Sequence, residues 1–251
     1  MNNALLSSLV FLIATLYASA GFGGASGYLT AMSFFSIPVS VMASTALVLN
    51  IVVSSISFTS YTRAGHLRWN LLLPFLITST PTAFIGGYLK ISEQVYTTLL
   101  YLMLTYLAIR MLFFRTPAES VEWTPRTVPL WAALASGAVI GLLSGMLGIG
   151  GGIFLSPLIL LAQWGNSKQA ATSAGGFIAI NSVSGLVGRI LSGTLSFGQF
   201  GLWLLPAGLL GAVIGSRSGA MKFSGAGVRR ALGVILMIAV GTYWFSIFLS
   251  L

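Results

Sequence analysis

The chain contains no cysteine and no aspartate, and it has one histidine and three glutamates among its 251 residues. Without cysteine it has no disulfide, no thiolate nucleophile and no cysteine metal ligand. Without aspartate it has no Ser-His-Asp triad, and its one histidine, His66, lacks partners for a metal site. The carboxylates, Glu93, Glu119 and Glu122, are predicted to lie in loops, so a proton or sodium site inside a membrane is not expected. We therefore expect no enzyme activity, no cofactor and no metal.

Charged residues are also scarce, at 6% of the chain, whereas 56% of the residues are hydrophobic. A soluble domain carries roughly 25% charged residues to cover its surface, so water is not the expected solvent. Apolar stretches such as Tyr96–Phe114 and Val128–Leu147 have the ~20 residues that a helix needs to cross the hydrocarbon of a bilayer. The composition predicts one membrane domain with the lipid bilayer as its surroundings.

Basic residues outnumber acidic ones by twelve to three, which gives a net charge of +9. They lie between apolar segments rather than in one patch, which is typical of cytoplasmic anchors facing anionic headgroups. No nucleic-acid partner is expected. The N-terminus, Met1-Asn2-Asn3, lacks the basic region of a signal peptide, so the first apolar stretch is expected to be retained.

Ten apolar segments predict an all-α, polytopic membrane protein. Eight are long enough to be spans, at about 4–20, 39–61, 69–89, 95–114, 129–147, 169–191, 198–216 and 229–250. Two shorter pieces, at about 28–37 and 153–162, each follow a glycine-rich break. The first and fifth spans are therefore predicted to be broken helices, each followed by a short return or continuation.

A polar segment at 115–127 is predicted to be a cytoplasmic linker between a first membrane repeat, 1–114, and a second, 128–251. Small residues and prolines recur in the same order in both halves, which indicates an internal repeat. The matched positions are Gly21 with Gly145, Gly24 with Gly148, Gly27 with Gly151, Ala43–Ala46 with Ala171–Ala174, Gly65 with Gly193, Pro81 with Pro206, and Gly86 with Gly211.

The basic residues gather in a few loops, which the positive-inside rule places in the cytoplasm. They are Arg63, Arg68, Arg110, Arg115, Arg126, Lys168, Arg217, Lys222, Arg229 and Arg230. Eight simple crossings would put the 62–68 and 217–228 loops on opposite sides. The conflict disappears if each broken segment enters and returns, or is two spans. The two halves then form an inverted repeat about an axis in the membrane plane, each with a glycine-broken segment and three spanning helices, and both termini outside.

The glycine-rich breaks are the first candidate for a substrate site. Glycine adopts positive φ without strain and lets several backbone N–H groups face a ligand, and the following short helix adds its positive dipole end. Two breaks that meet near the midplane from opposite sides would bind a compact anion. Close helix packing is the alternative explanation for any single glycine. The candidate residues here are Gly23, Gly24, Ser26, Gly27, Gly148, Gly150, Gly151 and Gly152.

Uncharged hydrogen-bond donors follow each break on the next long span. These are Ser44, Thr45 and Asn50 in the first half, and Thr172, Ser173 and Asn181 in the second. Hydroxyl groups of this kind suit sulfonate or sulfite oxygens, but they also commonly bond to carbonyls of their own helix. Both interpretations stay open for each of them.

Arg189 is the most informative charge, because it lies near the end of an apolar span whose loop is predicted to be outside. It is expected either to reach the headgroups or to face the pathway and attract anions. Lys90 and Lys168 are better explained as interfacial anchors. His66 is better explained as a solvated loop residue than as a proton relay.

The stretch Ser144–Pro157, followed by Ala170-Ala171-Thr172-Ser173, resembles the TauE/SafE family of membrane sulfite exporters, and a weaker copy runs from Gly21 to Thr30. The similarity spans essentially the whole chain. It implies export of sulfite, sulfoacetate or a similar organosulfonate across the inner membrane of a bacterium. The first half has Ala25-Ser26-Gly27-Tyr28 where the family often has a glycine triplet, so the two sides of the site are expected to differ.

An alternating-access anion exporter driven by the membrane potential is the leading hypothesis. Its partners would be a small anionic substrate and the bilayer, and a homo-oligomer stays open. An anion channel with the same fold is the second hypothesis. A non-transporting membrane scaffold for sulfur-metabolism proteins is the third, although the loops are short and offer little docking surface.

Overall fold

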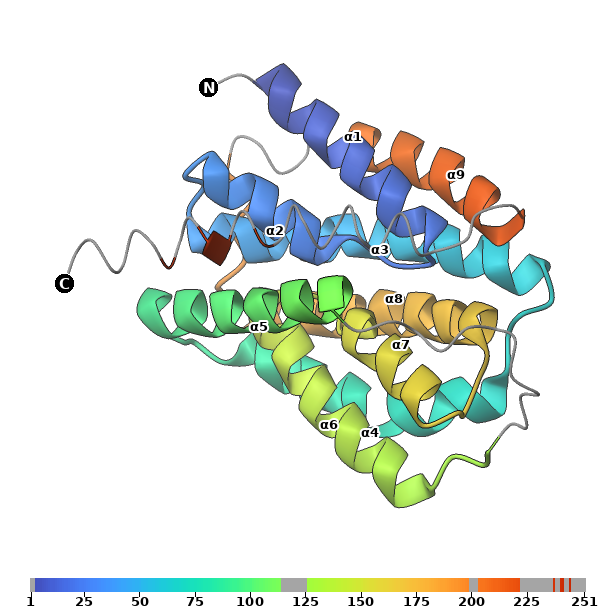
Figure 1. Cartoon of the computed structure of the whole chain (residues 1–251). Helices are drawn as coiled ribbons and strands as arrows, with labels where there is room; N and C mark the ends of the chain where they lie inside the picture. The colour runs from blue at the N-terminus through green and yellow to red at the C-terminus, as the bar shows by residue number, and fades with distance from the viewer. Residues whose placement is uncertain are drawn as a thin grey trace.

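The computed structural model describes residues 3–113, 126–198 and 203–221, together with residues 237, 240, 241 and 244. These residues form an all-α fold, as predicted (Figure 1). The helices are α1 (Asn3–Ser19), α2 (Ala25–Phe34), α3 (Val39–Arg63), α4 (Trp69–Tyr88), α5 (Glu93–Phe113), α6 (Leu130–Leu147), α7 (Gly152–Leu161), α8 (Ser167–Leu191) and α9 (Leu205–Met221).

Four of these helices, α3, α4, α6 and α8, are long and apolar enough to cross a membrane, and α7 and the Ala4–Ser19 part of α1 are shorter apolar helices. The protein is therefore a multi-pass membrane protein. Most predicted spans agree with a helix to within a few residues. The span predicted at 198–216 begins later, at Leu205.

Some predicted segments cannot be compared with a helix or differ from it. The span at 229–250 and almost all of the 115–127 linker lie outside the described residues. Glu93 was expected in a loop but is the first residue of α5.

The order and length of the helices repeat between the two halves. α1 and α6 have 17 and 18 residues, α2 and α7 have ten each, and α3 and α8 have 25 each. In both halves a glycine break separates the first helix from the short one. This repetition is the arrangement that an internal repeat predicts.

The helices form two layers, each made of parallel neighbours (Figure 1). One layer consists of α1, α3 and α9, and the other of α4, α6 and α8. Each layer therefore takes two helices from one half and one from the other. α3 and α8 meet between the layers and run antiparallel, because Lys168 at the start of α8 lies over the ring of Tyr61 near the end of α3, while Ser196 after α8 donates to Ser44 near the start of α3. Antiparallel equivalents are what an inverted repeat requires, and the complete inverted relation remains a prediction.

Glycines bring helices within each layer into backbone contact. A Cβ added at Gly137, Gly141 or Gly145 of α6 would collide with carbonyl oxygens of α4. Gly211 and Gly215 of α9 make the same kind of contact with carbonyl oxygens of α1. Lipid supplies no hydrophobic drive to hold helices together, so close van der Waals packing between small residues takes that role.

The broken segments return part of the way across the bundle. α1 and α3 run in the same direction, since α9 packs in parallel with both of them, so the chain must come back between their ends. The ten residues of α2 make this return, and α7 makes it between the parallel helices α6 and α8. This return removes the conflict between the basic loops, because Arg63 and Arg217 then line one cavity at the same end of the bundle.

Other cations lie at this same end. Lys168 lies 5.5 Å from the centroid of the Tyr61 ring, and that ring tilts against His66. Partial burial, and then the charge of Lys168, lower the pKa of His66. The positive-inside rule predicts that this end faces the cytoplasm.

The inverted repeat predicts that Gly65 and Gly193 lie on opposite sides of the membrane. Both are exposed, both have positive φ, and neither has an atom within 4 Å of an added Cβ. The chain has no cysteine, so Gly65→Cys and Gly193→Cys each introduce a single thiol. We expect a membrane-impermeant maleimide to label Gly65→Cys only in inside-out vesicles and Gly193→Cys only in intact cells. The unmodified protein is the blank, and labelling of both positions from one side would contradict the inverted arrangement.

Candidate functional site

Both glycine breaks contain residues in the left-handed region of backbone conformation. Gly21 and Gly24 have φ of 84° and 98° in the first break. Gly148, Gly150 and Gly151 have φ of 75°, 78° and 76° in the second. Side chains are strained in this region and glycine is not. The breaks are thus places where the chain leaves one helix and immediately starts another inside the bundle.

The N–H groups of each break have no hydrogen-bond partner among the described residues. Residues 23–27 and 149–153 are buried, and none of their N–H groups donates to an acceptor in the described part of the chain. The residues that precede α2 and α7, Gly24 and Gly151, have no side chain with which to cap these helices. Buried N–H groups without an acceptor are rare in proteins. Each group of donors lies at the positive end of a short helix, which is the arrangement that binds anions at helix N-termini in other proteins.

The two breaks meet at Asn50 and Ile178. A Cβ added at Gly23 would lie 2.6 Å from Asn50 Oδ1 and 2.9 Å from Ile178 Cγ2. A Cβ added at Gly150 would lie 2.8 Å from Asn50 Nδ2 and 2.7 Å from the same Ile178 atom. Asn50 and Ile178 are each the twelfth residue of a 25-residue helix. Helices of this length measure ~37 Å and span the ~30 Å hydrocarbon core, so the meeting point lies close to their midpoints.

Side chains satisfy the carbonyl groups at the end of α6. Arg189 Nη2 donates to the Met146 oxygen at 2.7 Å, and Tyr96 Oη donates to the Leu147 oxygen at 2.9 Å. Asn50 Nδ2 donates to the Gly148 oxygen at 3.3 Å. Three helices thus supply one donor each to three consecutive carbonyls. A cation at this position also stabilises the negative end of the helix dipole.

Arg189 turns inward rather than toward the headgroups, and its side chain is only 8% exposed. Its Nε atom has no partner among the described residues. The repeat places Tyr61 at the equivalent position of α3, and Tyr61 Oη donates to the Ser19 oxygen at the end of α1, at 2.8 Å. Each long helix therefore reaches back to the end of the broken helix of its own half. A role for Arg189 in attracting anions stays a prediction.

The predicted hydroxyl donors fall into two classes that the repeat preserves. Ser44 and Thr172 donate to the carbonyls of Ser40 and Lys168, four residues earlier on their own helices. Thr45 and Ser173, the next residues along, are buried and their hydroxyl groups have no partner in the described structure. The first pair therefore satisfies its own helix, whereas the second pair has donors to spare.

Asn181 is the most conspicuous unsatisfied side chain. It is fully buried, and neither its Oδ1 nor its Nδ2 has a partner among the described residues. The adjacent Ser182 is also buried, its Oγ has no partner in the described part of the chain, and this atom lies 3.2 Å from a Cβ added at Gly150. Asn50 Oδ1 is likewise buried and has no partner in that part of the chain. Polar atoms in this state near a break indicate a ligand or water that completes them.

Some of the predicted site residues are already engaged in packing or hydrogen bonds within the protein. The Ser26 hydroxyl forms a 2.6 Å hydrogen bond with Tyr17 Oη, so it has a partner within the first half. A Cβ added at Gly27 would press on Ile13 of α1, and one added at Gly152 would lie 2.6 Å from the Ala174 oxygen. Both glycines are therefore explained by packing, whatever their N–H groups bind.

The structure shifts the alignment of the two breaks. Gly24 precedes α2 and Gly151 precedes α7, so these two glycines are equivalent, whereas the sequence match paired Gly151 with Gly27. Gly27 lies inside α2 and Gly145 lies inside α6. The sequence analysis did not predict Tyr28, Tyr96 or Ser182 as residues near the site. A Cβ added at Gly24 would lie 2.7 Å from the Tyr28 ring, whose hydroxyl group is buried without a partner.

The comparisons with known proteins agree with this architecture. The family model described as "Sulfite exporter TauE/SafE" matches residues 6–243. A probable membrane transporter protein of Sinorhizobium fredii is 37% identical over 235 residues, which cover 93% of this chain and 95% of that protein. A probable membrane transporter protein of Methanocaldococcus jannaschii is 25% identical over 218 residues, which cover 83% and 80%. No solved structure matches the chain significantly. The chain belongs to the TauE/SafE family of membrane transporters.

Proposed function

We propose that this protein exports a small sulfur-containing anion, such as sulfite, sulfoacetate or a similar organosulfonate, from the cytoplasm by alternating access. The observation that carries the proposal is the presence of two sets of buried N–H groups, at residues 23–27 and 149–153, near the point where the two breaks meet; none of them has an acceptor among the described residues. The named substrates come from the family description. The N–H donors at the breaks support an anionic substrate.

The arrangement of donors favours an anion over a cation or a neutral solute. The first turns of α2 and α7 present N–H groups and positive dipole ends, and no carboxylate of the described residues lies at the breaks. Carbonyl groups that would attract a cation at the end of α6 are already bonded to Arg189, Tyr96 and Asn50. An oxyanion with several acceptor oxygens would complete the remaining donors.

The side chains with spare donors extend this site. Asn50, placed between the breaks, would orient the substrate with its amide group, and the Ser182 hydroxyl, 3.2 Å from a Cβ added at Gly150, would donate to the oxyanion. The hydroxyls of Thr45 and Ser173 also lack partners among the described residues and would be further donors along α3 and α8. Arg189 would contribute a positive potential. Export needs no coupled ion, because an inside-negative potential drives an anion outward with ~2.3 kcal/mol per charge per 100 mV.

A flux assay in proteoliposomes tests the proposal. We expect an inside-negative potential to drive efflux of sulfite or sulfoacetate, with much slower movement of sulfate and none of a potassium or sodium control. Collapse of the potential should slow the flux without abolishing exchange. Flux of the cation with none of the anions would overturn the proposed function.

Gly150→Ala tests whether the breaks form the site. The new methyl group would meet both Ile178 and Asn50 within 2.8 Å. We expect at least a tenfold loss of flux, which corresponds to ~1.4 kcal/mol. Gly193→Ala is the matched control, because Gly193 has a similar φ of 70° but no atom within 4 Å of an added Cβ. Equal flux in the two variants would show that the loss comes from backbone strain alone.

Asn181→Leu separates function from stability. A buried polar group without a partner costs about 1–3 kcal/mol, so an apolar side chain of similar size should raise the melting temperature in detergent. The same change should weaken transport if the Asn181 amide group serves the substrate. Thr172→Val, which keeps the side-chain shape and removes a hydroxyl bonded to a carbonyl of its own helix, should change neither property much. A variant that is less stable and fully active would contradict this assignment.

A further inference from the structure

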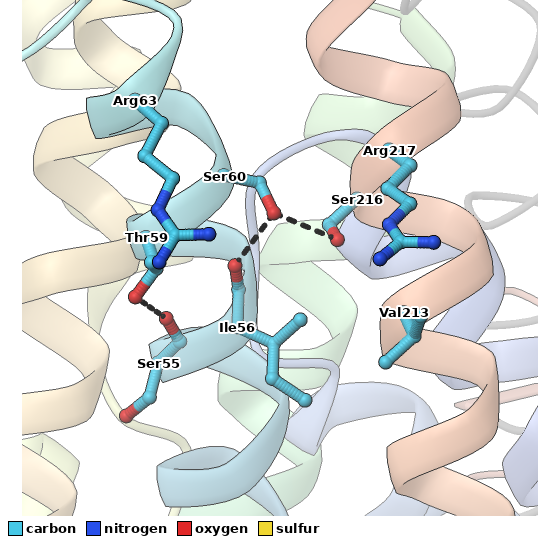
Figure 2. A pocket seen from close by; sticks show the side chains of 8 residues that line it. All are labelled: Ser55, Ile56, Thr59, Ser60, Arg63, Val213, Ser216 and Arg217. Carbon is cyan, nitrogen blue, oxygen red and sulfur yellow. Dashed lines mark hydrogen bonds between the residues drawn. The ribbon is translucent and has the colours of Figure 1, made fainter.

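A cavity of about 310 Å³ lies between α3 and α9, away from the glycine breaks (Figure 2). Arg63 and Arg217 line it from opposite helices, and their guanidinium groups flank a hydrogen bond of 3.1 Å between Ser60 and Ser216. Thr59 is a further hydroxyl-bearing residue of its lining. The cavity thus combines two cations with several hydroxyl groups.

The charges of this cavity are not balanced by the described protein. Glu93 is the one carboxylate in the described residues, and it lies at the start of α5, where no ion pair joins it to Arg63 or Arg217. Two guanidinium groups that share a cavity repel each other unless an anion lies between them. Guanidinium groups bind phosphate and sulfonate oxygens in pairs of hydrogen bonds. The ligand that fits this cavity is therefore an oxyanion group.

The repeat shows in which direction the cavity faces. Ser55, Thr59 and Arg63 form a stripe along α3, and the equivalent stripe on α8 is Val183, Val187 and Leu191. Those three apolar side chains are 47%, 42% and 64% exposed, and exposed apolar surface on a membrane protein is suited to contact with lipid. The polar stripe of α3 therefore occupies a lipid-facing position of the fold.

In the described part of the chain, the corresponding interface at the other end of the bundle, between α8 and α4, is closed. Gly188, the equivalent of Ser60, packs directly on the Phe84 oxygen of α4 and closes the interface between α8 and α4. Ser60 instead bonds to Ser216 across the gap between α3 and α9. α9 also extends past the cavity to Met221. Among the described residues, the open interface between α3 and α9 thus lies at the end where Arg63 and Arg217 are.

We propose that this cavity binds the phosphate head group of an anionic phospholipid from the cytoplasmic leaflet. Basic cavities between helices on the cytoplasmic side are a recurrent form of lipid-headgroup site. The lipid-facing stripe favours a lipid over a soluble anion, because acyl chains would continue along the apolar surface of α3 below the head group. The bound lipid would bridge α3 and α9, which come from different halves of the chain.

A titration of the delipidated, detergent-solubilised protein tests the proposal. Phosphatidylglycerol should raise the melting temperature, whereas phosphatidylcholine with the same acyl chains should not. The double variant Arg63→Gln/Arg217→Gln should need at least tenfold more phosphatidylglycerol for the same shift. Each single variant should need an amount of phosphatidylglycerol between those of the unmodified protein and the double variant. Each shift is measured against the variant's own lipid-free melting temperature, and a cooperative melting transition shows that the variant is folded.

Arg68→Gln is the matched control, since Arg68 is an exposed arginine five residues from Arg63 that does not line the cavity. It should bind phosphatidylglycerol as the unmodified protein does. An equal loss in Arg68→Gln would mean that the attraction is spread over all the cations, which overturns the site. Equal protection by inorganic phosphate or sulfite would assign the cavity to a soluble anion and overturn the lipid. These measurements involve no flux, so a failure of the lipid-binding proposal can be distinguished from a failure of the proposed transport function.

Discussion

The constraint on which this fold depends is that a helix cannot end inside a bilayer without partners for its terminal backbone groups. The chain ends α1 and α6 in the interior and starts α2 and α7 there. At the α6 end it supplies donors for the freed carbonyls from Asn50, Tyr96 and Arg189. At the start of each short helix the described part of the chain supplies no acceptor for the freed N–H groups.

This asymmetry follows from the composition. The usual caps of a helix N-terminus are Asp, Asn, Ser and Thr, but the chain has no aspartate and places glycine before both short helices. α8 shows that the same chain can build a full cap, because Asn166 and Gln169 form a reciprocal capping box at its start. The helices α3, α4 and α6 also start without a side-chain cap, but their first residues are exposed or partly exposed, whereas the uncapped starts of α2 and α7 are buried. That contrast is the physical basis for placing an anion between the breaks.

The positions of the long helices could be predicted from the sequence, but the contacts between side chains and backbone groups of different helices could not. Apolar length and glycine clusters located α3, α4, α6 and α8 closely, because crossing hydrocarbon demands long uninterrupted runs. The register of the repeat was wrong at Gly27 and Gly145, since a sequence match does not distinguish a glycine in a turn from one that packs against a carbonyl. Tyr96 was missed for a related reason. A tyrosine in an apolar span carries no signal that its hydroxyl meets a carbonyl 51 residues away.

Asn50 joins these observations to a proposed mechanism. It donates to Gly148 of the opposite half, and it touches both breaks, while its counterpart by the repeat is the apolar Ile178. Tyr61 and Arg189 differ in the same way, one neutral and one charged at equivalent positions. A carrier with identical halves would have inward-open and outward-open states of equal energy. Different donors at the two helix ends remove that equality, so the substrate's contacts with Asn50 and the potential of Arg189 would set which state binds the anion more tightly.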